Sequence, residues 1–382
     1  MFNQEKSSPL KIGYLVSAVL FLLLLIPFFR DYLREMGLRW LYILLFSLSL
    51  SYILTPIAGW FARKVHILDV PDQRKIHAKS TPLLGGMAIM TSFCASLMSN
   101  MVLERQMVVL LCGAVLVGLV GLLDDWRGLS ARLKLGIQVG VVVILIFNGI
   151  LLDLLPPKTT WGMAGNAVLT VIWIVGITNA MNFFDGMDGL ATGLGAIISL
   201  LMGIVSFQTH QPFMGWIAIA VLGSCLGFLP FNFRPRKPAA IFLGDAGSTF
   251  LGFVLAALAV KGYWADDQPI VSFATPLLIF WILIFDMAYI TVERVITGKV
   301  RTLKEWIDYV GTDHLHHRLY ALLDDKRKAV LTIFLFAAAL GLGSLALRNA
   351  QMTDAVILVC QAALMVILFS FLEHAGRKAQ KG

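Results

Sequence analysis

Charged residues are scarce in this chain of 382 residues: only 14% are Asp, Glu, Lys or Arg, while 58% are hydrophobic. Soluble globular chains carry about 25% charged residues, so the composition excludes an ordinary water-soluble protein. Cysteine is also scarce, and the four cysteines lack the spacing of a metal site and the density of a disulfide scaffold. A GxxxxGK[ST] motif is absent from the sequence, so ATP binding by a P-loop is not supported.

Hydrophobic residues fall instead into twelve long blocks, each approaching the length of a transmembrane helix. Lipid forces backbone groups to pair within their own segment, and no alternating ten-residue segments indicate a β-barrel. We therefore predict an all-α polytopic integral membrane protein with about 11 to 12 transmembrane helices, the first being an uncleaved anchor. The blocks are 12–29, 38–61, 83–103, 107–123, 133–152, 167–184, 190–208, 213–231, 246–262, 272–292, 329–347 and 354–372.

Lys and Arg residues are unevenly divided between the two sides that these helices define. One side, which includes both termini, carries 24 of the 31 basic residues. The positive-inside rule places that side in the cytoplasm. This bias accounts for the net charge of +8, so a nucleic-acid partner is not predicted.

Acidic residues stand at three helix ends on the predicted cytoplasmic side, where basic residues are expected. They are Asp124, Asp125, Asp185, Asp188 and Asp245. Taken singly, Asp245 reads as a helix cap and Asp124 as a solvated helix end. Taken together, converging carboxylates require a cation, and hard oxygen ligands favour Mg²⁺ or, alternatively, Mn²⁺.

Asp185 and Asp188 are three residues apart, so they share a helix face if the helix continues through them. Asn179 and Asn182 lie one turn earlier in the same stripe. Such polar density at the end of a lipid-embedded helix is costly unless it faces a cavity. Simple helix packing explains Asn179 better than it explains the two acids.

Histidine and arginine cluster in the loop DHLHHRL, as His314, His316, His317 and Arg318. Imidazole donors and a forked guanidinium suit phosphate oxygens, so we predict a phosphate site; a metal site and a solvated surface cluster are the alternatives. A second basic segment brings Lys75 and His77 to the same side, where ordinary positive-inside charge is the alternative explanation.

Acids for a divalent cation and bases for phosphate, set in a helix bundle, predict phosphoryl transfer onto a lipid. The rival class is a twelve-helix secondary transporter. Transporters place their binding groups near the bilayer midplane, whereas these acids stand at helix ends, which favours an enzyme.

Five motifs, in order, carry a family resemblance: DVPDQRKIHAKSTPLLGG, LLDDW, NFFDGMDGLATG, FLGDAGS and DHLHHRL. They resemble the polyprenyl-phosphate N-acetylhexosamine-1-phosphate transferases, and HLHHRL resembles the branch that uses UDP-N-acetylglucosamine. The resemblance implies transfer of N-acetylglucosamine 1-phosphate from a UDP-N-acetylhexosamine to polyprenyl (undecaprenyl) phosphate, with release of UMP.

The resemblance also implies roles for individual residues. Asp245 would be the Mg²⁺ ligand, and Asp124 and Asp125 would face the lipid phosphate. Asp185 and Asp188 would lie by the nucleotide and metal, and the remaining residues would bind substrate. That last set is Asn179, Asn182, Asn232, Lys75, His77, His314, His316, His317 and Arg318. Asp286, an acid inside the tenth block, also fits the family pattern.

The predicted organisation has three parts. Residues 1–37 form an extra N-terminal anchor helix and linker, residues 38–328 the catalytic transmembrane domain, and residues 329–382 the last helices and a basic tail. The predicted location is the bacterial inner membrane, with multiple passes through the lipid bilayer and an active site on the cytoplasmic face. The sequence leaves a homodimer open.

Overall fold

Helices make up almost all of the computed structural model, which describes residues 8–69, 80–101, 104–234, 236–265, 269–309 and 311–379. The first half of the chain contains α1 (Ser8–Leu24), α2 (Pro27–Glu35), α3 (Arg39–Lys64), β1 (Leu68–Asp69), β2 (Thr81–Pro82), α4 (Gly85–Ser99), α5 (Arg105–Arg127), α6 (Ala131–Phe147), α7 (Thr160–Phe183) and η1 (Phe184–Gly186). The second half contains α8 (Leu190–Gln208), α9 (Pro212–Asn232), α10 (Gly244–Lys261), α11 (Pro269–Ile279), α12 (Trp281–Ile296), α13 (Leu303–Asp308), α14 (Leu315–Leu323), α15 (Lys326–Leu342), η2 (Gly343–Asn349) and α16 (Met352–Ala379).

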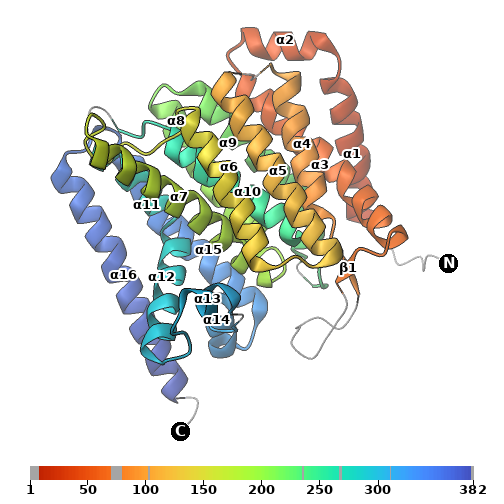
Figure 1. The fold of residues 1–382 in the computed structure, drawn as a ribbon. Coiled ribbons are helices and arrows are strands. Elements are labelled where there is room, and N and C mark those ends of the chain that lie inside the picture. The colour runs from red at the N-terminus through yellow and green to blue at the C-terminus, as the bar shows by residue number, and fades with distance from the viewer. Residues whose placement is uncertain are drawn as a thin grey trace.

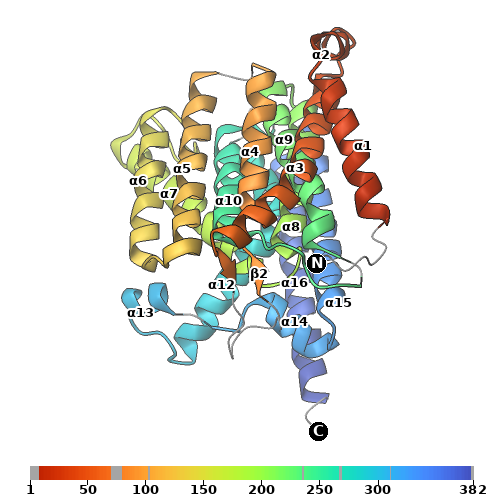
Figure 2. The same cartoon turned by 90° about the vertical axis from the view of Figure 1, so that its right-hand side faces the viewer.

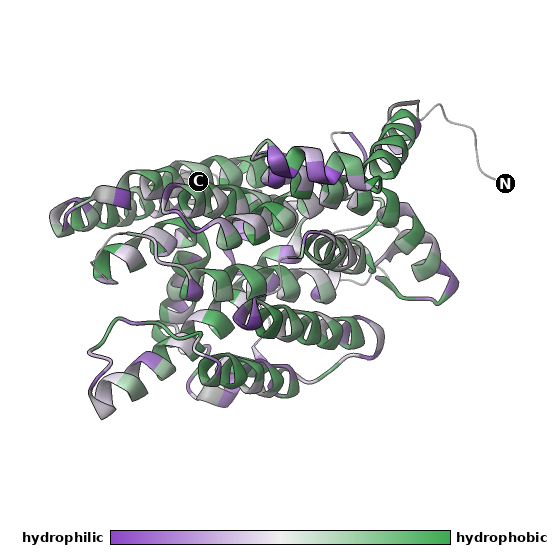
Figure 3. Ribbon diagram, turned by 90° about the horizontal axis from the view of Figure 1, so that it is seen from above, coloured by the Kyte–Doolittle hydropathy of each residue, from purple (hydrophilic) through white to green (hydrophobic). Residues whose placement is uncertain are grey.

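Each predicted hydrophobic block coincides with a helix or a bent helix pair. Among the described residues, eight helices are long and apolar enough to cross a membrane, or ten if each bent pair counts as one span. The other two blocks correspond to α4 and α6, of 15 and 17 residues. Seen along the bundle axis, the ribbons are predominantly hydrophobic (Figure 3). The prediction of an all-α, multi-pass membrane protein is confirmed.

The helix α10 lies at the centre of the bundle, between α4, α5 and α7 (Figure 2). In its most apolar window 89% of the residues are buried inside the protein, compared with 17% for α16 at the periphery. Glycine makes the close approach possible: a Cβ atom at Gly86 of α4 would lie 2.2 Å from the backbone nitrogen of Gly247. A Cβ at Gly121 of α5 would lie 2.4 Å from the carbonyl oxygen of Asp245. Because both positions lack a side chain, the first turn of α10 packs directly against α4 and α5.

Two of the apolar blocks are bent. The first turns by 77° between α1 and α2, so that α2 lies across one end of the bundle (Figure 1). The tenth, which the sequence treats as one straight helix, turns by 80° between α11 and α12. The break falls at Phe280, and it directs α12 away from the bundle towards α13 and α14 (Figure 1).

The end of the bundle opposite α2 carries the short elements that the hydrophobic pattern does not predict. Here β1 and β2 form a two-stranded antiparallel ribbon, with Leu68 opposite Pro82. The helices α13 and α14 lie at the same end, as do the start of α1 and the end of α16 (Figure 1). We call this the α14 end of the bundle, and the other the α2 end.

Candidate active site

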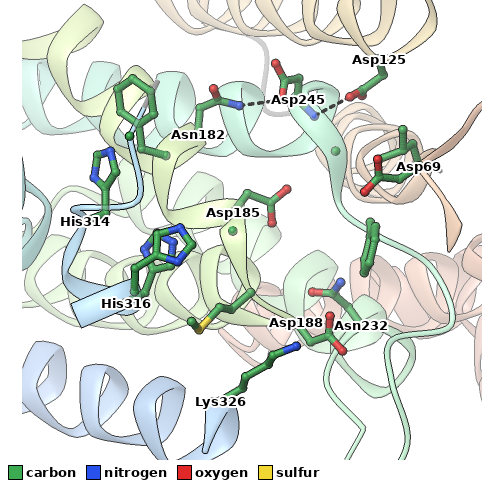
Figure 4. Close-up of a pocket in the computed structure, with 18 of the residues that line it drawn as sticks. Asp69, Asp125, Asn182, Asp185, Asp188, Asn232, Asp245, His314, His316 and Lys326 are labelled. Carbon is green, nitrogen blue, oxygen red and sulfur yellow. Dashed lines mark hydrogen bonds between the residues drawn. The ribbon is translucent and has the colours of Figure 1, made fainter. Parts of the chain in front are cut away.

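A cavity of about 470 Å³ opens at the α14 end of the bundle. Its walls come from the junction of α7 and α8, the start of α10, the loop before α14 and α14 itself (Figure 4). Nine of the residues singled out in the sequence line it: Asp125, Asn182, Asp185, Asp188, Asn232, Asp245, His314, His316 and His317. The fold thus gathers residues from motifs that lie as much as 190 positions apart in the sequence.

Asp245 stands in the first turn of α10, with both carboxylate oxygens engaged. Asn182 of α7 donates to Oδ1 at 2.9 Å, and the ammonium group of Lys134 lies 2.9 Å from Oδ2. The helix-cap interpretation of Asp245 is wrong, because Asp125 of α5 accepts hydrogen bonds from the backbone N–H groups of Asp245 and Ala246, at 2.9 and 3.1 Å. The cap comes from another helix, and Asp245 is left to face the cavity.

Lys134 links two of the predicted acids. Its ammonium group pairs with Asp124 as well as with Asp245, and its side chain is only 20% exposed. Asp124 also accepts a hydrogen bond from the backbone of Leu129, so it is not a solvated helix end. Lys134 is not among the predicted site residues, because in the sequence it reads as one of the positive-inside charges. The available signal was its position inside an apolar block, where a lysine is costly unless it has a partner.

The helix carrying Asn182 does not continue through Asp185 and Asp188, so the predicted shared helix face is wrong. The α7 helix ends at Phe183, one turn of 3₁₀ helix follows, and Gly189 adopts a left-handed conformation with φ of 76°. Both acids nevertheless line the cavity. Asp188 accepts a hydrogen bond of 2.8 Å from the backbone nitrogen of Ala239, which fixes the loop between α9 and α10.

The three predicted asparagines have different surroundings. Asn182 contacts Asp245, as described above. Asn232 is buried, accepts from the Thr192 hydroxyl at 3.0 Å and donates to the Ile241 carbonyl at 3.1 Å. Asn179 lies outside the cavity lining and donates to the side chain of Gln138 at 2.7 Å. Its contacts are those of helix packing, which was the alternative for this residue.

The histidines of α14 and the residue before it form the wall opposite Asp245. His316 is 1% exposed, and neither of its ring nitrogens has a hydrogen-bond partner among the residues that the structure describes. A Cβ at Gly186 would lie 2.5 Å from Nε2 of His316, so glycine is needed where the two segments meet. Burial lowers the pKa of His316 well below its ordinary value, and the neighbouring histidines act in the same direction. Burial also lowers the pKa of His317. Both rings are therefore neutral near pH 7.

Besides Asn179, three residues predicted to bind substrate are not brought to this cavity by the described structure. Arg318 is 5% exposed and does not line it, because its guanidinium stacks on the ring of Tyr289 at 4.0 Å and lies between two buried acids. Lys75 and His77 lie outside the described residues. Conversely, Asp69, Tyr309 and Lys326 line the cavity and were not predicted as site residues. Asp69 is the first residue of the DVPDQRKIHAKSTPLLGG motif, which was the available signal. Nothing in the local sequence separates Tyr309 and Lys326 from ordinary loop residues.

The donor set of the cavity suits a hard divalent cation. No group of three or more His, Cys, Asp or Glu side chains in the described part of the chain is close enough to form a ready-made metal site. Mg²⁺, however, is commonly held by only one or two carboxylates together with waters and substrate phosphates. Asp245 and Asp185, two carboxylates that line the cavity, meet that requirement.

Comparison with known proteins assigns the chain to a family. Residues 107–263 match glycosyl transferase family 4. The chain is 34% identical to the probable undecaprenyl-phosphate N-acetylglucosaminyl 1-phosphate transferase of Bacillus subtilis, over 80% of this chain and 84% of that protein. It is 30% identical to the decaprenyl-phosphate N-acetylglucosaminephosphotransferase of Mycobacterium tuberculosis, over 81% and 83%. The phospho-N-acetylmuramoyl-pentapeptide-transferase of Staphylococcus aureus is 28% identical over 56% of this chain and 74% of that protein.

Proposed function

The chain belongs to glycosyl transferase family 4 and transfers N-acetylglucosamine 1-phosphate to a polyprenyl phosphate, and from this premise we propose that its donor is UDP-N-acetylglucosamine. The five-motif resemblance is confirmed by the relatives, and nothing in them supports the transporter alternative. The observation that carries the proposal is the composition of the cavity, where acids from α5, η1 and α10 face the histidines at the start of α14.

In the proposed reaction, an oxygen of the lipid phosphate attacks the sugar-bearing phosphorus of the donor. The bond from that phosphorus to the oxygen bridging it to the UMP phosphate breaks, and UMP leaves with both electrons of the bond. The products are UMP and polyprenyl diphosphate-linked N-acetylglucosamine. Two anions must meet, so positioning and neutralisation of charge supply most of the catalysis.

Lys134 is proposed to attract the phosphate of the lipid. Asp125 is committed to the backbone of α10, and Asp124 to Lys134 and Leu129. Neither carboxylate is therefore free to act as a general base. A lipid phosphate is largely ionised near pH 7 and needs none, since the second pKa of a phosphate monoester is about 6.

Mg²⁺ is proposed to bind at Asp245, with Asp185 as a second oxygen ligand. When bound, the cation would neutralise phosphate charge in the transition state. Asn182 orients Asp245 through its hydrogen bond to Oδ1. Lys134 holds the other oxygen, so the two side chains fix the direction of the carboxylate.

The histidine wall is proposed to receive the donor. His316 presents two ring nitrogens beside the cavity that have no hydrogen-bond partner in the described part of the chain, and leaving such groups unsatisfied in a buried position is costly. A polar ligand in the cavity would satisfy them. Asn232 and Asp188 lie next to each other across the cavity from His316 (Figure 4) and would complete the donor pocket.

The test is UMP release by purified protein supplied with undecaprenyl phosphate, Mg²⁺ and, in turn, UDP-N-acetylglucosamine, UDP-N-acetylgalactosamine and UDP-glucose. We expect UMP with the first donor and about 5- to 150-fold less with UDP-glucose, because lost hydrogen bonds to the acetamido group cost about 1–3 kcal/mol. UMP from none of the donors would contradict the proposal.

We also propose that the α14 end faces the cytoplasm of a bacterial inner membrane. The loops at this end carry most of the basic residues. In a variant whose four native cysteines are replaced, a cysteine placed at Thr312 should resist an impermeant thiol reagent in intact cells and react after lysis. A cysteine at Lys158, at the α2 end, should react in intact cells. The reverse pattern would overturn this orientation.

A further inference from the structure

Asp286 of α12 is a fully buried acid that does not line the cavity, yet it is bound to a residue that does. Its Oδ2 lies 2.7 Å from Nδ1 of His314, and its Oδ1 accepts a hydrogen bond of 2.7 Å from the backbone nitrogen of Leu315. Both contacts fall at the start of α14. The acid thus holds the backbone and the side chain of the segment that forms the histidine wall.

The orientation of His314 follows from this contact. An ionised carboxylate only accepts hydrogen bonds, so Nδ1 of the ring must carry the proton. The ring also stacks on Phe183, with centroids 4.9 Å apart. With Nδ1 turned to Asp286 and one face covered by Phe183, Nε2 is the ring nitrogen left for a ligand in the cavity that His314 lines.

A chain of charges explains how a fully buried acid is tolerated at this position. Arg318 places its guanidinium 3.9 Å from Asp286 and 3.4 Å from Glu373 of α16, and stacks on Tyr289. A buried carboxylate without a counter-charge would cost several kcal/mol. Arg318 therefore keeps Asp286 in place, rather than reaching the cavity.

We propose that Asp286 is a positioning residue of the transferase: it fixes the ring of His314 so that Nε2 meets the UDP-sugar. Arg318 in turn provides the counter-charge for Asp286. The inference rests on the proposed function, because it presumes that the donor occupies the histidine wall. Asp286 itself touches no substrate. An amide at this position can keep the contact to Leu315, so the contribution that Asp286→Asn removes must pass through His314. That property separates Asp286 from a residue that only stabilises the fold.

The first test is Asp286→Asn, assayed with each substrate varied in turn. The amide can still accept the hydrogen bond from Leu315, but its NH₂ group would face the N–H of His314. The ring must then change tautomer or turn. Partners that orient a functional histidine are typically worth about 10- to 100-fold, so we expect kcat/KM for UDP-N-acetylglucosamine to fall by that factor. The KM for the lipid should stay within about twofold.

The second test is a double-mutant cycle with His314→Ala. If Asp286 acts through the ring, Asp286→Asn should have no further effect in the His314→Ala background. Losses that multiply fully in the double variant would overturn the inference, as would wild-type kcat/KM for Asp286→Asn. The matched control is Asp308→Asn, which breaks an exposed ion pair with Arg132 in the neighbouring segment and should leave kcat/KM within about twofold.

Folding is checked by monodispersity and thermal midpoint in detergent. Asp286→Glu retains the carboxylate and should recover part of the activity lost in Asp286→Asn. If neither variant yields folded protein, the carboxylate is structural and the inference fails. UMP release by the wild-type protein is measured first, so a failure of the proposed function is recognised separately from a failure of this inference.

Discussion

The two ends of the bundle differ in how their charged residues are arranged. The α14 end has a cavity of about 470 Å³ lined by Asp125, Asp185, Asp188 and Asp245, while the α2 end has one of about 280 Å³ whose charged lining residues are Asp153 and Lys261. Both ends consist of helix termini and connecting loops. Of these two cavities, only the one at the α14 end is lined by acids from several elements. Convergence of charge, and not its presence at helix ends, distinguishes the candidate active site.

The two ends also differ in how deeply their paired charges are buried. At the α14 end, Lys134 lies between two acids from different helices, and Arg294 forms two hydrogen bonds, of 2.8 and 2.6 Å, with Asp313. Burial would raise the pKa of Asp313, but Arg294 holds it below its ordinary value. At the α2 end, contacts such as the one between Arg348 and His210 are exposed. Matched residues at the α2 end therefore provide controls for each substitution at the α14 end.

The largest loss of activity is expected for Asp245→Asn. Its control at the α2 end is Asp153→Asn. The substitution preserves side-chain size and removes a charge proposed to bind Mg²⁺, so activity should fall by about 1,000-fold or more, since a metal contributes several kcal/mol to such a transition state. Asp153→Asn should retain activity within about twofold. UMP release is measured at saturating Mg²⁺ and again with excess chelator. Wild-type turnover of Asp245→Asn, or of the wild type in chelator, would reject the metal assignment.

Lys134→Gln is expected to lower activity less than Asp245→Asn does. Its control at the α2 end is Lys261→Gln. Loss of the ammonium group leaves Asp124 and Asp245 facing each other without a cation, and charge-assisted hydrogen bonds are worth about 1.5–3 kcal/mol each. We expect kcat/KM to fall about 10- to 150-fold, with partial recovery in Lys134→Arg. Steady-state kinetics with the lipid varied gives the measurement. An unchanged kcat/KM would show that the acids tolerate each other without the lysine.

The smallest expected effect is on how the stability of the folded protein depends on pH. It is tested with His316→Gln, and His210→Gln at the α2 end is the control. The folded-state pKa of His316 is lowered by burial, whereas the unfolded chain binds a proton near pH 6.5. The unfolded state therefore takes up more protons, and stability should fall as the pH drops below about 6.5, by up to about 1.4 kcal/mol per pH unit.

Thermal midpoints measured in detergent at pH 7.5 and 5.5 test this expectation. The drop in midpoint between the two pH values should be smaller in His316→Gln than in the wild type. His210→Gln, at an exposed position of the α2 end, should show the wild-type drop. An equal drop in all three proteins would mean that His316 is not held neutral by the fold.

Much of the architecture could be predicted because helix formation in lipid depends on local sequence. The block from 107 to 123 became α5, and the block from 246 to 262 became α10, because apolar segments of that length satisfy their own backbone groups. The exceptions are breaks. The 80° turn at Phe280 was missed, since the apolar run continues through it without a change in hydropathy.

The residues of the candidate site were predicted better than their contacts. Unusual polar residues at helix ends, such as Asp185 and His316, are visible in the sequence because they are costly there. Lys134 was overlooked because one lysine near a basic loop looks like ordinary topology. Arg318 was assigned to the cavity because it adjoins the histidines in the chain, yet it faces Tyr289 and Glu373.

The sequence by itself determined the helical membrane fold, the order of the five motifs and the residue types available for phosphoryl transfer. Only the tertiary structure decided that Asp125 caps α10, that Lys134 joins Asp124 to Asp245, and that Asp286 holds His314. The physical reason is the range of the interactions. Helix formation depends on neighbouring residues, whereas these partners lie 10 to 120 positions apart and meet only in the folded bundle. At the first turn of α10, glycines such as Gly86 and Gly121 allow the close packing of helices that brings Asp125 to Asp245.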